Sequence, residues 1–117
     1  MQISEVHYED AVPIDGYGPG FFRVNGDVIH GGAIITATGA RSWGGYDDVE
    51  AVLALKDKVD FILMGTGETM APVNKEFRDA MEAAGIGVEP MASASACRTY
   101  NVLVSEGRRV AAVVLPL

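Results

Sequence analysis

The stretch from Ser93 to Pro116 constrains the fold of this chain more than any other. Its first half has apolar residues at helical spacing, namely Ala96, Tyr100, Leu103 and Val104. We expect Ser93 or Ser95 to cap this helix and Gly107 to end it in the left-handed conformation. Residues 109–115 then form an apolar run that Pro116 stops, which is typical of a strand covered on both faces. A helix that leads directly into such a strand predicts a layered α/β fold.

Upstream of this stretch the chain alternates between strand and helix patterns. Short apolar runs predict further strands over 33–38, 60–65 and 86–90. Helical patterns over 46–56 and 73–84 separate them. Strands that alternate with helices are normally parallel and joined by right-handed crossovers. We therefore expect an α/β, three-layer domain with a mostly parallel four-stranded sheet flanked by helices.

The N-terminal region is expected to add a β-hairpin layer. Residues 21–24 and 27–30 flank Asn25-Gly26, a dipeptide that tolerates the positive φ angles of a tight hairpin turn. A turn-rich loop at 15–20 precedes this hairpin. An isolated hairpin is barely stable in water, so it should pack against the rest of the chain. We expect one domain over 1–117, with a hairpin region at 1–32 and an alternating unit at 33–117.

Composition limits the classes of partner. The 117 residues carry 16 acidic and 9 basic side chains, and the net charge of −7 disfavours nucleic-acid binding. Cys97 is alone, so we expect no internal disulfide, and no Cys/His cluster predicts a metal or cofactor site. The N-terminus lacks a targeting pattern, and no apolar run is long enough to insert stably in a membrane. These features predict a cytoplasmic protein and leave homo-oligomerisation open.

Three glycine-loop residues at the end of one predicted strand, Gly65, Thr66 and Gly67, are the first candidate site. Glu89 lies 22 positions after Gly67, which imitates the spacing of a dinucleotide-binding fingerprint. However, Met70 occupies the place of the third glycine. The match is therefore poor, and a tight turn with close backbone packing is the favoured explanation of these glycines, although their amides could also hold a small anion.

The helix after Ser93 carries the second candidate site. Arg98, Thr99 and Asn101 could bind a ligand or a partner. In the structural alternative, Glu106 and Arg108 belong to a local polar network and Asn101 fixes a loop. If Glu106 forms a buried pair with an arginine, Glu106→Ala should cost about 3–5 kcal/mol. If Arg98 lines an open crevice, Arg98→Ala should cost less than about 0.5 kcal/mol but weaken binding.

Two further residues each admit two interpretations. Cys97, near a helix N-terminus and before Arg98, could be a reactive thiolate or a small core residue. Trp43 could lie at the edge of the core or form an exposed anchor for a protein partner.

Four segments, taken together, carry a resemblance to a known family. They are I-D-G-Y-G-P-G-F-F-R-V-N-G, F-I-L-M-G-T-G, M-E-A-A-G-I-G-V-E-P-M and A-C-R-T-Y-N-V-L-V-S-E-G-R-R-V-A-A-V-V-L-P. They resemble a small family of largely uncharacterised α/β proteins that includes assembly factor 3 of mitochondrial complex I. The resemblance implies a three-layer fold in which the 33–38 strand could be central. It also implies a protein-binding role and no catalytic residue.

Two functions follow as expectations. The first is a non-enzymatic protein-interaction domain that assists assembly of a respiratory or other membrane-associated complex, with protein partners of unknown identity. The alternative is a domain that binds a small anion or a nucleotide at the carboxyl ends of the strands, through Gly65, Thr66, Gly67 and Arg98.

Overall fold

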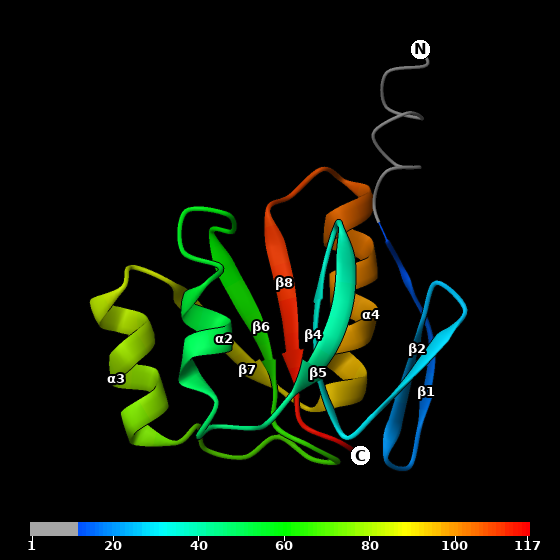
Figure 1. Cartoon of the computed structure of the whole chain (residues 1–117), viewed down its shortest axis with the longest axis horizontal. Helices are drawn as coiled ribbons and strands as arrows, with labels where there is room; N and C mark the ends of the chain where they lie inside the picture. The colour runs from blue at the N-terminus through cyan, green and yellow to red at the C-terminus, as the bar shows by residue number, and fades with distance from the viewer. Residues whose placement is uncertain (1–11) are drawn as a thin grey trace.

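A computed structural model describes residues 12–117 of the chain. The first eleven positions of the predicted hairpin region therefore lie outside the described residues. The described part contains eight strands in two sheets and three helices. The larger sheet lies between two layers, with α2 and α3 on one side and α4 with the smaller sheet on the other (Figure 1). This arrangement confirms the predicted α/β class.

The large sheet has five strands in the order β5-β4-β8-β6-β7, with β8 at the centre. β6 pairs in parallel with both β7 and β8, whereas β4 pairs antiparallel with β5 and β8. The strands are β4 (Gly32–Thr36), β5 (Gly39–Trp43), β6 (Phe61–Gly65), β7 (Gly87–Met91) and β8 (Val110–Val114).

The prediction of a mostly parallel four-stranded sheet is therefore wrong in two respects. The first is β5, a fifth strand, which the sequence does not reveal because the four residues before Trp43 are small or polar. The second is β4, which is antiparallel to β8 and not central. The crossover rule applies to strands joined through a helix, but β4 continues directly into β5 through a short turn.

β8 is buried along its whole length, as predicted. Val110, Ala112 and Val114 contribute to the core beneath α4, while Ala111 and Val113 contribute to the core beneath α2 and α3. This alternation places an apolar side chain in one of two cores at every position of the central strand. The apolar run at 109–115 thus reflects coverage from both sides.

α4 (Ser93–Ser105) packs on β6 and β8 through Ala96, Cys97, Tyr100 and Val104. It ends before Gly107, whose φ of 84° confirms the predicted left-handed stop. The predicted serine cap is wrong, because the N-cap residue is Ala92 and no side chain caps the helix. The hydroxyl of Ser93 instead forms hydrogen bonds with the backbone of Gly67 and Leu115.

The opposite face is covered by α2 (Val49–Leu53) and α3 (Lys75–Ala83). Asn74 caps α3 by accepting a hydrogen bond from the amide of Phe77 at 2.9 Å. α2 is much shorter than the predicted 46–56, because residues 54–58 form turns and Asp57 has a φ of 69°. One corner of the sheet is consequently left without a helix above it.

The small sheet consists of β1 (Ile14–Gly18), β2 (Phe21–Val24) and β3 (Asp27–His30) in antiparallel order. The predicted hairpin is confirmed: Val24 pairs with Asp27, and Asn25 and Gly26 have φ angles of 51° and 85°. β1 lies where a loop was predicted, since its glycines resemble turn residues. As expected, this sheet packs against the rest of the domain, with Ile14, Phe22 and Val24 in the α4-side core.

Candidate functional site

The glycine loop after β6 is joined to the start of α4 and to the end of β8 by a closed set of hydrogen bonds. The amide of Gly67 donates to Ser93 Oγ at 3.0 Å, and Ser93 Oγ donates to the carbonyl of Leu115 at 2.7 Å. The amide of Ser93 donates to the carbonyl of Gly67 at 2.8 Å. Ser93 is fully buried, so its hydroxyl is a structural link between three segments.

Thr66 completes this set. Its amide donates to the carbonyl of Met91 at 2.8 Å, and its hydroxyl accepts from the amide of Ala71 at 2.9 Å. The same hydroxyl donates to the carbonyl of Thr69 at 2.8 Å. The amides of Thr66 and Gly67 therefore already have protein acceptors. This geometry favours the tight-turn interpretation of the loop over an anion cradle.

Gly65 is required for close packing at the same place. A Cβ on Gly65 would lie 2.6 Å from Val114 Cγ1, 2.7 Å from Ser93 Oγ and 2.9 Å from Ser93 Cα. The absence of a side chain therefore lets the N-terminus of α4 approach β6 directly. Close helix–strand contact explains this glycine without a ligand.

The polar residues of α4 face the small sheet. Asn101 accepts a hydrogen bond from the amide of Ile14 at 2.8 Å and donates to the carbonyl of the same residue at 2.9 Å. Tyr100 Oη donates to the carbonyl of Val12 at 3.0 Å. Asn101 thus fixes β1 to α4, which agrees with its structural interpretation.

Arg98 and Thr99 are more accessible. Arg98 is exposed, and its guanidinium donates to Tyr17 Oη at 2.9 Å and to Ser95 Oγ at 3.4 Å. Thr99 is half-buried and lines a shallow apolar groove of about 300 Å³ between α4 and the β6–β7 pair. A partner-binding role for these two residues stays a prediction.

Trp43 belongs to the core. It is 4% exposed, and its Nε1 donates to the carbonyl of Asp48 at 2.9 Å. Its ring lies 5.9 Å from the ring of Tyr46 and 5.8 Å from that of Phe77. The alternative of an exposed anchor is therefore wrong, because the helical layer covers the indole.

Glu106 does not form the expected buried pair. Its side chain is exposed, and the ion pairs within residues 12–117 are Lys75–Asp79 at 2.8 Å and Arg109–Asp60 at 3.3 Å. Arg108 instead lies over the ring of Phe61, 5.7 Å from its centroid. Exposed charges contribute little to stability, so the large loss expected for Glu106→Ala has no basis in this geometry.

Cys97 is a core residue. It is 1% exposed, and burial raises the pKa of its thiol to about 12, against a smaller lowering by the charge of Arg98. A reactive thiolate requires the opposite shift of the pKa and access for a reagent. The structural interpretation of Cys97 is therefore favoured.

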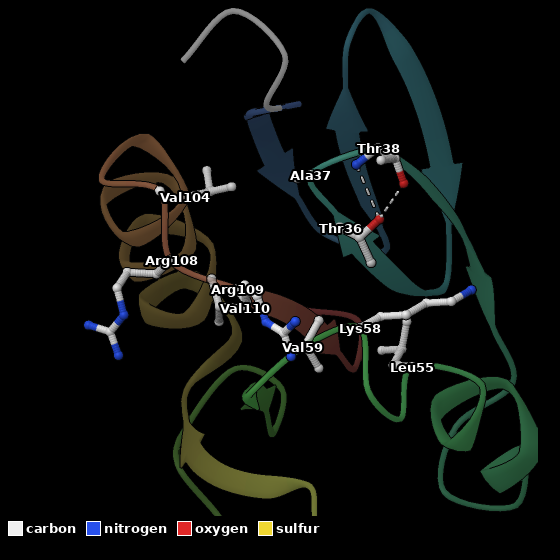
Figure 2. Close-up of a pocket in the computed structure, with 11 residues that line it drawn as sticks. Thr36, Ala37, Thr38, Leu55, Lys58, Val59, Val104, Arg108, Arg109 and Val110 are labelled. Atoms are coloured by element: carbon white, nitrogen blue, oxygen red, sulfur yellow. Dashed lines mark hydrogen bonds between the residues drawn. The ribbon is translucent and has the colours of Figure 1, made fainter. Parts of the chain in front are cut away.

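A further pocket lies elsewhere, at the amino ends of β6 and β8. Its volume is about 550 Å³, and it is enclosed by the turn after β4, the segment after α2 and the α4–β8 connection (Figure 2). Lys58, Arg108 and Arg109 lie along it. The sequence contains a weak signal, the Arg108-Arg109 pair, but it does not show that three distant segments meet there.

Residues 12–117 contain neither a cluster of metal-binding side chains nor a membrane-spanning helix. No three His, Cys, Asp or Glu side chains gather there closely enough to hold a metal ion. Over the same residues, no helix has the length and apolar character needed to cross a membrane.

Comparison with known proteins places the chain in a family. The family described as "Protein of unknown function (DUF498/DUF598)" matches residues 14–115. The chain belongs to this family. An uncharacterized protein of Rhodobacter capsulatus is 50% identical to this chain over 117 residues. The aligned residues make up all of this chain and 94% of the Rhodobacter protein.

Two other similar proteins have more informative names. The rat NADH dehydrogenase (ubiquinone) 1 alpha subcomplex assembly factor 3 is 28% identical over 123 residues, which cover 99% of the DUF498 chain and 66% of the factor. The chain thus spans slightly less than two thirds of that factor. The crystal structure of an outer membrane protein from Bartonella henselae has a TM-score of 0.80 at 31% identity, with coverage of 91% of this chain and 95% of that one.

Proposed function

We propose that this DUF498 domain is a non-enzymatic protein-interaction module that helps to assemble a respiratory or other membrane-associated complex. The similarity to a complex I assembly factor over 99% of the chain supports this class of function. The candidate site residues support it as well, because Thr66, Asn101 and Cys97 are occupied by contacts within the fold. We further propose that the domain acts in the cytoplasm and takes a protein, not a nucleic acid, as its partner, in accord with its net charge of −7.

The free edge of β5 carries the proposal. β5 pairs with β4 on one side and has no strand partner on the other within the described residues. Three consecutive residues of this edge, Ala40, Arg41 and Ser42, are exposed. A free strand edge is a template for an extended segment of another protein, which adds to the sheet through backbone hydrogen bonds.

The opposite edge of the sheet is less suited to this use. β7 contains Pro90, which has no amide hydrogen, and Glu89 is exposed. Proline and charged side chains are features that keep edge strands from pairing. The five residues of β5 contain no proline, so every amide on that edge can donate a hydrogen bond. We therefore assign partner binding to β5.

A binding experiment with two matched variants tests the proposal. Ser42→Lys places a charged side chain on the β5 edge, whereas Ala83→Lys adds the same side chain at an exposed position of α3. Both variants should melt within a few degrees of the wild-type domain. We expect the wild-type domain and Ala83→Lys to recover the same defined protein from native cells, and Ser42→Lys to recover much less of it.

Two results would contradict the proposal. Repeated isolation of the wild-type domain without any protein partner, under gentle conditions, would argue against an interaction role. Equal recovery of a partner by Ser42→Lys would place the interface elsewhere on the domain.

A further inference from the structure

The large pocket exists because β4 and β8 separate before their ends. Their pairing runs from Ala33–Val114 to Ile35–Ala112. In the same register, a longer ladder would bring the backbone of Ala37 opposite that of Val110. The carbonyl of Ala37 instead accepts a hydrogen bond from the amide of Val12 at 3.0 Å. The turn after β4 is thereby drawn toward β1 and away from the central strand.

This separation leaves backbone polar groups of β8 facing the pocket. The carbonyl of Arg109 accepts from the amide of Asp60 beside β6, so alternation along the strand directs the backbone of Val110 to the opposite side. On that side, the pairing of β8 with β4 ends at Ala112, so Val110 lies beyond the last β4 residue in the ladder. A strand amide beyond the end of its ladder can donate a hydrogen bond to a ligand oxygen.

The lining of the pocket is apolar with a basic margin. Leu55, Val59, Val104 and Val110 supply its apolar surface, and its eleven residues include three bases and no acid. This is a marked local reversal in a chain with 16 acidic and 9 basic residues. Figure 2 shows Arg109 directed inward, while Arg108 turns away and Lys58 extends past Leu55.

Arg109 can take part in ligand binding despite its ion pair. Its Nη2 lies 3.3 Å from Asp60 Oδ1, but both side chains are more than half exposed, so the pair is weak. A guanidinium has five N–H donors, and one ion pair leaves others available for a carboxylate. The volume of about 550 Å³ also lies in the range of about 300–1,000 Å³ that is common for small-molecule sites.

We infer that this pocket binds an amphipathic monocarboxylate, a medium-chain fatty acid, with the hydrocarbon chain against the valines and the carboxylate at Arg109 and the amide of Val110. The inference goes beyond the proposed protein-binding role and does not depend on it. A fatty acid satisfies both halves of the lining, whereas a hydrophilic anion leaves the apolar surface in contact with water.

Titration with octanoate, followed by the backbone amide signals of the ¹⁵N-labelled chain, tests the inference. We expect saturable one-to-one binding, with the signals of Val110 and Thr38 shifting and the signal of Gly67, at the other end of the sheet, unchanged. Acetate, which lacks the hydrocarbon chain, should not bind, and 1-octanol, which lacks the charge, should bind about fivefold more weakly.

Two arginine variants locate the charge contact. Arg109→Gln should weaken octanoate binding by about fivefold, whereas Arg23→Gln, an exposed change on β2 outside the pocket, should leave it unchanged. Thermal melting of both variants confirms that each is folded. The inference is overturned if the folded wild-type chain does not bind octanoate, if octanoate shifts amides without saturation or away from the pocket, or if 1-octanol or Arg109→Gln gives the wild-type affinity.

Discussion

Gly65 shows how a single residue sets the distance between layers. The Cβ of any other residue would approach the backbone of Ser93 within 2.9 Å, and backbone atoms cannot move aside as a flexible side chain can. The hydrogen bonds between Gly67, Ser93 and Leu115 depend on this distance. The glycine of the loop is thus explained by packing and by polar satisfaction together.

Gly65→Ala should destabilise the domain by about 1–3 kcal/mol, because the new methyl group overpacks the α4–β6 contact. Gly16→Ala is a matched control, since nothing lies within 4 Å of a Cβ at that position. Chemical denaturation of both variants measures the difference. Equal stabilities would show that the layers tolerate a greater separation than the structure implies.

Cys97 makes the free energy of unfolding fall with rising pH in the alkaline range. Burial raises the pKa of its thiol from 9.0 to about 12, so folding favours the neutral thiol. This contribution is fully present below pH 9 and is lost as the pH rises from 9 toward 12. The free energy of unfolding should therefore fall more steeply over this range for the wild-type chain than for Cys97→Ala. Identical pH slopes would refute the assignment of Cys97 to the core.

At the scale of elements, α4 connects the large sheet to the small one. Its apolar residues pack on β6 and β8, while Tyr100 and Asn101 bind the backbone of residues 12 and 14. The two bonds of Asn101 satisfy both backbone groups of Ile14, whose side chain is buried. The polar content of this helix therefore serves the attachment of β1.

Asn101→Ala should cost about 1–3 kcal/mol, because it leaves the half-buried amide and carbonyl of Ile14 without partners. Val102→Ala changes a neighbouring residue that is 56% exposed, so its effect should stay below about 0.5 kcal/mol. Denaturation experiments and amide hydrogen exchange at Ile14 measure the two effects. Unchanged exchange at Ile14 in Asn101→Ala would mean that β1 is held by other contacts.

The sequence predicted elements well where local chemistry decides them. Asn25-Gly26 forces a tight turn, and the run around Val110–Val114 is apolar on both faces, so the hairpin and β8 were both foreseeable. Gly39–Trp43 has neither an apolar run nor regular alternation, and its strand character comes from pairing with β4. The direction of β4 relative to β8 depends on tertiary contacts that no local pattern contains.

The candidate site was less predictable for the same reason. The sequence could suggest that Gly67 and Ser93 meet at the carboxyl ends of the strands. It could not show that the serine hydroxyl would accept a hydrogen bond from the amide of Gly67. It also could not show that Lys58 and Arg109, 51 positions apart, lie along one pocket. Such contacts depend on how the strands separate at Ile35 and Ala112.

At the scale of the whole described domain, the two ends of the β6–β8 pair differ. At the carboxyl ends of β6 and β8, Ser93 forms hydrogen bonds with the segments that follow both strands. The amino ends of the same strands border the pocket of about 550 Å³. The edge of β5 lies next to that pocket, since Thr36, Leu55 and Lys58 line both it and a second hollow reaching Ala40 and Arg41. The pocket and the strand edge that we propose as binding sites thus adjoin each other.

Amide hydrogen exchange of the domain, alone and bound to its purified protein partner, tests the central claim most directly. Backbone hydrogen bonds across a new strand pair slow the exchange of edge amides. We predict that the partner slows exchange at Ala40 and Ser42, whose amides face the free edge of β5, and leaves β7 on the opposite edge unchanged. Slowed exchange confined to the Gly65–Gly67 loop, with β5 unchanged in the complex, would contradict the account.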